Sequence, residues 1–230
     1  MTTSHEIATW WEAEWAREVA EQEQRSGVEA AKWRAAGRKT KDKPDAESAK
    51  FWAEEGLRQV QSYADWLANS EWQIASFNGQ PLVEFSLAGT FADIPVKGYV
   101  DAVFDSPSGW IVVDYKSGSR DPAGPQQLAL YSVMLERLGM PRAEWGTFFN
   151  TRKGELGPVE SLAQWDQAWW EKQFTRLMKA RDHEIYLPHI SDMCRGCGVR
   201  QFCYAVGGLQ SHLYDPDNPN YGNMTQKETA

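Results

Sequence analysis

Apolar residues recur at intervals of three and four along several segments of the chain, which is the period of an amphipathic helix. The segments with this period are residues 7–25, 28–36, 46–69, 126–138 and 162–183. Gly139, followed closely by Pro141, is typical of the end of the fourth segment. The pattern therefore predicts three long helices, one shorter helix and a helical extension of the first.

Short runs rich in β-branched and aromatic residues predict strands between these helices. They span residues 72–77, 82–87, 96–104, 110–116 and 145–150. Asn78-Gly79 separates the first two runs and is a strong hairpin signal, while residues 105–109 form a turn between the next two. From residue 46 to 150 the order is helix, three strands, helix and strand, with one additional strand before them. This order predicts a mixed α/β fold.

The ends of the chain differ in composition from this central part. Residues 1–45 are expected to form a helical segment with a polar, basic linker at 37–45, and residues 46–187 the α/β core. Residues 188–208 contain the cysteines, and the polar residues 209–230 are predicted to be a disordered tail. We therefore expect one domain with a helical lobe, and not two large domains.

Composition narrows the class of protein further. No apolar stretch approaches 18 residues, so no membrane-spanning helix or membrane partner is expected. The first residues lack the basic and then apolar regions of a secretory signal. Three cysteines, two of them in a C-x-x-C, argue against a disulfide framework and for an intracellular metal site.

The predicted hairpin of residues 96–116 brings charged side chains together. Asp101 and Asp114 lie equally far from the centre of the turn, so they are expected opposite each other on one face. Lys116 returns to that face two residues later. Two carboxylates and an ammonium suit a magnesium-dependent phosphodiesterase, because Mg²⁺ prefers oxygen ligands and keeps several waters. The alternative is a surface Asp–Lys pair, which the apolar neighbours of these residues oppose.

Three motifs in this region resemble the RecB-type branch of the PD-(D/E)XK nucleases. They are Gly98-Tyr-Val-Asp101, Ile111-Val-Val-Asp114-Tyr-Lys116-Ser-Gly118 and Gln127-Leu-Ala-Leu-Tyr131. That branch includes the RecB nuclease domain, AddB and CRISPR-associated exonucleases, with many phage relatives. The resemblance implies the αβββαβ core of that fold, and a protein of the cytoplasm of a bacterial or phage-infected cell.

The resemblance also assigns roles to individual residues. Asp101 and Asp114 would bind Mg²⁺ or Mn²⁺ with help from the Tyr115 carbonyl, and Lys116 would assist the attacking water. Gln127 and Tyr131, on one helix face, would order the site. Support for the metal is expected from Glu84 on the preceding strand and from His5 on the first helix. Glu84 could equally be a solvent-facing carboxylate, and the glycine that precedes such a histidine in the family is absent before His5.

The spacing Cys194-x2-Cys197-x5-Cys203 resembles the C-terminal cysteines of the iron–sulfur members of the branch. A [4Fe–4S] cluster normally needs four thiolates, and this chain has three cysteines. The favoured explanation is that the protein starts further upstream, where both the fourth cysteine and the glycine before His5 would lie. A Cys₃His zinc site using His183, His189 or His212 is the second explanation, and ordinary thiols the third.

Basic residues are candidates for DNA contacts despite the net charge of −8, which argues against a generalised basic footprint. Lys172, Arg176 and Lys179 are spaced for one helix face, and six basic residues fall within residues 32–43. Arg195 and Arg200 stand among the cysteines, where they could offset thiolate charge or contact DNA. Each of the first two groups could equally be a solvated surface.

We therefore expect a metal-dependent DNA exonuclease that acts on DNA ends in recombination, repair or phage DNA processing. An endonuclease would use the same chemistry, so the choice between them follows from the resemblance alone. The alternative is a non-catalytic subunit that binds DNA or carries an iron–sulfur cluster within a larger nuclease or helicase complex.

Overall fold

The computed structural model describes residues 4–35, 37, 39–42, 44, 46–118, 122, 124–183, 185 and 189–213. The chain divides into two compact units, Met1–Thr175 and Arg176–Ala230, which are considered separately. Residues 214–230 of the predicted tail lie outside the described residues, as do Arg38 and Lys43 of the basic linker and Pro188 before the cysteines.

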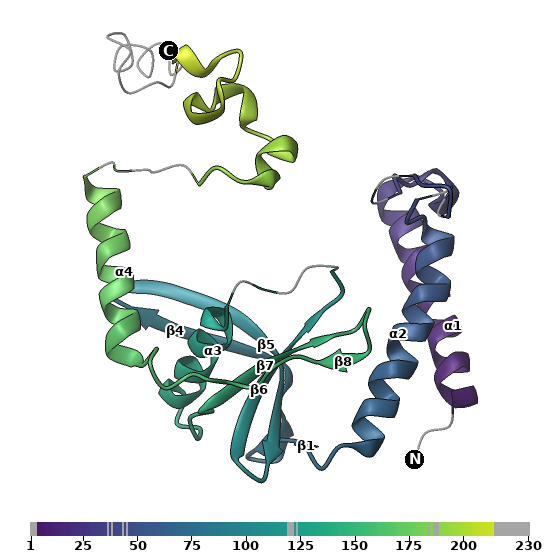
Figure 1. Cartoon of the computed structure of the whole chain (residues 1–230), viewed down its shortest axis with the longest axis horizontal. Helices are drawn as coiled ribbons and strands as arrows, with labels where there is room; N and C mark the ends of the chain where they lie inside the picture. Colours follow the sequence, from purple (N-terminus) through teal and green to yellow (C-terminus); the bar gives the residue numbers. More distant parts are fainter. Residues whose placement is uncertain are drawn as a thin grey trace. The chain divides into compact units, whose positions relative to one another are not determined.

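The first unit is built on a seven-stranded mixed sheet with the strand order β1-β5-β6-β7-β8 (Figure 1). β4 also pairs with β5, and β9 with β7. The β6–β7 pair is parallel and the other pairs are antiparallel. The strands are β1 (Gln73–Ile74), β4 (Val83–Phe91), β5 (Ile94–Ser106), β6 (Gly109–Lys116), β7 (Trp145–Asn150), β8 (Glu155–Leu156) and β9 (Glu160–Ser161).

Helices cover both faces of this sheet because its central strands are apolar on both sides. On one face, α3 (Gln126–Arg137) packs against the sheet through buried residues that include Leu128 and Val133. On the other face, Tyr63, Trp66 and Leu67 of α2 (Ala49–Asn69) pack on the cluster around Phe104 and Phe149. The α2, β4-β5-β6, α3, β7 order confirms the predicted mixed α/β class and the αβββαβ core.

The N-terminal helix α1 (Ser4–Ser26) lies beside α2 and has no buried residue among those described (Figure 1). Its Trp11 Nε1 donates a hydrogen bond of 2.7 Å to the Ala53 carbonyl of α2. Gly27 adopts a φ of 67° and ends the helix, so the predicted extension over residues 28–36 is wrong. Among residues 28–35, which the structure describes, the helical structure is limited to η1 (Ala30–Lys32), a short 3-10 turn.

Two other predicted boundaries move for reasons of local capping. α2 begins at Ala49 instead of residue 46, because the Ser48 hydroxyl accepts from the Phe51 N–H. The last long helix, α4 (Gln167–Asp182), begins five residues later than predicted, after Asp166, whose carboxylate accepts from the Trp169 N–H at 2.8 Å. Leu162, which was assigned to this helix, is instead fully buried in the core.

Asn78-Gly79 forms the predicted turn, but the strands that it joins are very short. Asn78 and Gly79 both have positive φ, as a two-residue hairpin requires, between β2 (Ser76–Phe77) and β3 (Gln80–Pro81). The longer partner of β5 is β4, which extends to Phe91 and turns through Ala92 and Asp93 at φ values of 45° and 62°. That turn contains no glycine, so the sequence carried no signal for it.

The second unit contains the end of α4 and four short 3-10 helices among its described residues. They are η2 (Asp192–Gly196), η3 (Arg200–Phe202), η4 (Tyr204–Val206) and η5 (Ser211–Leu213). Gly208 packs so closely that a Cβ there would lie 2.3 Å from the Arg200 carbonyl oxygen. In the part of the chain that the structure describes, no helix is long and apolar enough to cross a membrane.

Candidate active site

The β5–β6 hairpin places Asp101 across from Asp114. Its register runs from Ser106↔Gly109 to Ala102↔Val113, so the next position brings the two carboxylates together. The turn is shorter than predicted: residues 105, 106 and 109 belong to the strands, and only residues 107 and 108 connect them. The centre of the turn is unchanged, and for this reason the predicted pairing of the carboxylates holds.

A backbone hydrogen bond fixes the first carboxylate against the neighbouring strand. The Tyr115 N–H donates to Asp101 Oδ2 at 2.8 Å. Tyr115 itself points to the other face of the sheet, where its hydroxyl and that of Tyr63 are hydrogen-bonded at 2.8 Å. This bond holds the Asp101 carboxylate, which comes from β5, beside the β6 backbone between Asp114 and Lys116.

The second carboxylate is almost fully buried. Asp114 is 2% exposed, and its Oδ2 lies 2.5 Å from Lys116 Nζ. Among the described residues, the Lys116 ammonium is the only recorded partner of Oδ2. Burial raises the pKa of the Asp114 carboxyl above its ordinary value, the Lys116 ammonium opposes this, and the charge of Asp101 adds to the increase.

Helix α3 completes the site from above the sheet. Gln127 Nε2 donates to Asp114 Oδ1 at 3.0 Å and to the Tyr131 hydroxyl at 2.8 Å, and Lys116 Nζ lies 3.5 Å from Gln127 Oε1. The Tyr131 ring rests on Gly98, where a Cβ would lie 3.0 Å from its Cε1 atom. The three sequence motifs thus meet in one place, because the glycine of the first makes room for the tyrosine of the third.

Strand β5 changes the phase of its alternation next to this site. Val100 and Val103 both pack in the cluster on the α3 face, although strict alternation would place them on opposite faces. The change falls where Glu84, across from Asp101 in the β4–β5 register, adopts a φ of 47°. Simple alternation along the sequence could not have predicted this local distortion.

Comparison with known proteins agrees with the geometry. A sequence model of the PD-(D/E)XK nuclease superfamily matches residues 2–204. The chain belongs to this superfamily. The Gene 69 protein of Mycobacterium phage D29 is 26% identical to it over 155 residues, which cover 64% of this chain and 57% of that relative. The chain therefore spans little more than half the length of this phage protein.

Nucleases of this superfamily depend on a divalent metal, and the carboxylates present fit one. Asp101 and Asp114 offer hard oxygen ligands from adjacent strands, and the one recorded partner of the buried Asp114 Oδ2 in the described residues is the Lys116 ammonium. Within the described residues, no group of three or more His, Cys, Asp or Glu side chains converges on one point. The two carboxylates could hold a divalent ion whose remaining positions would be filled by water and phosphate oxygens.

Two predicted metal-supporting residues lie apart from such a cluster. The Glu84 side chain is exposed, beside the site in register but at the distorted position of β4. His5 is exposed in the first turn of α1, whereas the helix that packs on the sheet is α2. The roles of Glu84, His5 and the Tyr115 carbonyl as metal ligands stay predictions.

The three cysteines lie in or beside successive 3-10 turns of the second unit as free thiols. Cys194 Sγ accepts a hydrogen bond from the Ser191 N–H at 3.4 Å and lies 3.9 Å from the His189 carbonyl oxygen. The described residues contain no converged group of thiols and imidazoles, so an iron–sulfur or zinc site at Cys194, Cys197 and Cys203 stays a prediction.

The predicted DNA-contacting residues are exposed. Lys172, Arg176 and Lys179 lie along α4, and Arg195 and Arg200 belong to η2 and η3 of the second unit. Their exposure is compatible with phosphate contacts and equally with a solvated surface.

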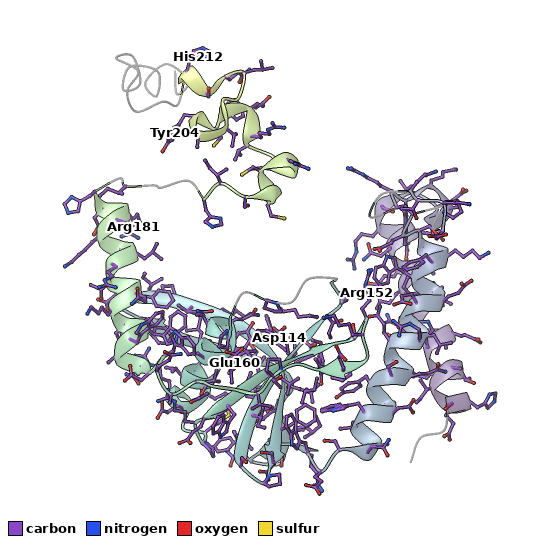
Figure 2. The ribbon with its side chains drawn as sticks, viewed as in Figure 1. Asp114, Arg152, Glu160, Arg181, Tyr204 and His212 are labelled. Atoms are coloured by element: carbon purple, nitrogen blue, oxygen red, sulfur yellow. The ribbon has the colours of Figure 1, made fainter. Side chains whose placement is uncertain are left out.

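The sequence analysis missed a group of residues that hold the end of β6 from the α2 side. Gln59 is the buried residue of α2, and it accepts a hydrogen bond of 2.6 Å from the Thr151 hydroxyl. Arg152, in the turn after β7 and near α2, forms a two-bond ion pair with Glu47 (Figure 2). The sequence offered one signal for this group, which is that Gln59 is a polar residue on the apolar side of an amphipathic helix.

A cavity of about 420 Å³ lies behind Tyr115, on the face of β6 opposite to the Asp114 side chain. Its walls are mainly aromatic and include Trp11, Trp15, Trp52 and Tyr63. Because the carboxylates and Lys116 face the other side of the sheet, this cavity is separate from the site of the proposed chemistry.

Proposed function

We propose that this chain is a Mg²⁺- or Mn²⁺-dependent DNA nuclease that hydrolyses phosphodiester bonds at Asp101, Asp114 and Lys116. The observation that carries the proposal is the meeting of these three side chains with Gln127 at the carboxyl end of β6. Membership of the PD-(D/E)XK superfamily supports the same conclusion independently of the geometry.

Each residue has a definite task in this proposal. Asp101 and Asp114 hold the metal, which when bound supplies an activated water and neutralises charge on the phosphoryl oxygens. Lys116 orients the attacking water and stabilises negative charge that develops on the phosphate. Gln127 keeps the Asp114 carboxylate in place, and Tyr131 keeps Gln127 in place, through the two hydrogen bonds described above.

We further propose that the enzyme is an exonuclease of the RecB-like type that acts on DNA ends. This assignment depends on the resemblance of the three motifs to those of the RecB-type branch. Gly98 of the first motif and Tyr131 of the third pack against each other in the structure. The similarity to a phage protein supports a phage setting, in which the enzyme would act in DNA processing, recombination or repair. DNA would be its principal partner, with a recombination or helicase protein as a further one.

The test is cleavage of end-labelled linear DNA, single- and double-stranded, in parallel with covalently closed circular DNA and in the presence of Mg²⁺ or Mn²⁺. We expect progressive loss of linear substrate, intact circles, and no loss in EDTA or with Asp114→Ala. Cleaved circles would show an endonuclease instead. An Asp114→Ala variant as active as the wild type would contradict the assignment of the site.

The competing function is a non-catalytic subunit that binds DNA or carries a cluster through Cys194, Cys197 and Cys203. Wild-type protein that binds DNA but cleaves none with any divalent metal would support this function. Visible absorbance after anaerobic purification would identify an iron–sulfur cluster, and stoichiometric zinc would exclude one.

A further inference from the structure

Three consecutive residues, the last of β7 and the two that follow it, each contact one of three consecutive carbonyl oxygens, the last of β6 and the two that follow it. The Thr151 N–H donates to the Lys116 carbonyl at 3.0 Å, and Arg152 Nε donates to the Ser117 carbonyl at 2.9 Å. Asn150 Nδ2 lies 3.5 Å from the Gly118 carbonyl and makes the weakest of the three contacts. The backbone that begins at Lys116 is therefore anchored residue by residue.

The anchor is itself fixed to helix α2 and the residues before it. The guanidinium of Arg152 bonds both carboxylate oxygens of Glu47, at 3.0 and 3.2 Å, and lies over the Trp52 ring at 5.0 Å. Arg58 donates to the Arg152 carbonyl at 2.6 Å. The Arg152 and Glu47 side chains are 22% and 18% exposed, so this pair is much less screened than a surface ion pair.

A second contact holds Thr151. A threonine hydroxyl has one hydrogen to donate, and Gln59 Oε1 at 2.6 Å is a closer acceptor than the Lys116 carbonyl at 3.3 Å. The backbone N–H of Thr151 remains for the Lys116 carbonyl. Gln59 thus fixes Thr151, whose N–H bonds the Lys116 carbonyl, and Arg152 fixes the residue that follows Lys116.

The consequence falls on the side chain of Lys116. Its ammonium reaches both Asp114 Oδ2 and Gln127 Oε1 from a strand that has no further ladder partner beyond Asn150. A displacement of about 1 Å at a catalytic group can cost about 100-fold in rate. A backbone end held through the Lys116, Ser117 and Gly118 carbonyls would therefore matter more for the rate than for substrate affinity.

We propose that Arg152 is a positioning residue for Lys116, acting through the Ser117 carbonyl and supported by Glu47. This inference rests on the proposed nuclease function. Arginine suits the role because its planar fork bonds Glu47 with two nitrogens while Nε remains free for the carbonyl, a geometry that lysine cannot reproduce.

The test compares Arg152→Lys, Glu47→Gln and the double variant with a matched control, Arg17→Lys. Arg17 also lies among carboxylates, on the exposed surface of α1, and it donates hydrogen bonds to Glu14, Glu18 and Glu21 of the same helix. For each protein we would measure kcat and KM for DNA cleavage, the thermal unfolding midpoint, and hydrogen exchange at the Thr151 amide.

We expect Arg152→Lys to lower kcat by about 10–100-fold, as the loss of a residue that orients a catalytic group typically does. KM should stay within about twofold of the control. Exchange at Thr151 should become faster. Glu47→Gln should act in the same direction, and the double variant should lose less than the product of the two single losses, because both act through one contact network.

The inference is overturned if kcat of Arg152→Lys matches that of Arg17→Lys, or if KM alone rises, since the latter would place the guanidinium on DNA. If Arg152→Lys fails to fold, Glu47→Gln decides the question, because it leaves the arginine in place. If the wild-type protein cleaves no DNA, the proposed function fails. Unchanged Thr151 exchange in Arg152→Lys would then separately overturn the anchoring role.

Discussion

Gln127 offers a direct test of how α3 supports the metal-binding carboxylate. In Gln127→Met, a side chain of similar length loses both amide groups, so Asp114 Oδ1 loses the donor at 3.0 Å. A hydrogen bond to a charged group contributes about 1.5–3 kcal/mol. Gln127 is exposed, so the lower end of that range applies. At about 1.4 kcal/mol per factor of ten, we expect cleavage to slow by about tenfold.

The assay is the initial rate of DNA cleavage at saturating substrate. Gln126→Met is the matched control, because Gln126 is an exposed glutamine one position earlier on the same helix. Its variant should retain the wild-type rate. Equal rates for the two variants would refute the argument that Gln127 holds Asp114 in place. A rise in KM with unchanged kcat would instead indicate that Gln127 contacts the substrate.

Two further predictions concern stability. Gly98→Ala should lower the free energy of unfolding by about 1–3 kcal/mol, because the new Cβ would lie 3.0 Å from the Tyr131 ring. The control Gly89→Ala adds its Cβ to open space and should not lower it. Equal denaturant midpoints for the two variants would contradict this prediction. Asp114→Asn, without metal, should be more stable relative to wild type at pH 7 than at pH 4. Burial raises the pKa of the Asp114 carboxyl in the folded state. The wild-type protein is therefore most stable below the pKa that this carboxyl has in the unfolded chain, and it loses stability as the pH rises through the pKa of the folded state, whereas the asparagine variant does not. A difference in thermal midpoint between the two proteins that does not change with pH would refute this prediction.

The hairpin site could be predicted because its determinants are local. The spacing of Asp101 and Asp114 around one turn fixes their pairing even though the turn is two residues long instead of five. The class of fold followed in the same way from the order of helical and strand periods. The resemblance then supplied the role of α3, whose Gln127 contacts Asp114 as expected of an ordering residue.

The errors arose from local backbone conformations that the apolar pattern does not reveal and from contacts between residues far apart in the sequence. Residues 28–36 have a helical pattern, but Gly27 at positive φ ends α1, and the described residues after it form a 3-10 turn at Ala30–Lys32. The turn at Ala92-Asp93 has two positive φ values without glycine, so β4 extended beyond its predicted end. Arg152 and Glu47 are 105 residues apart in sequence, and no pattern along the chain connects them.

The central claim is that Lys116 and the two carboxylates perform metal-dependent cleavage. The most direct measurement is the rate of linear DNA cleavage as a function of Mg²⁺ concentration for the wild type, Lys116→Gln and the control Lys97→Gln. Lys97 is a suitable control because it is exposed on β5 and contacts the Tyr99 ring. We predict metal-dependent cleavage by the wild type and the control, and loss of at least about 100-fold in Lys116→Gln. Cleavage by Lys116→Gln at the rate of the control would contradict the account.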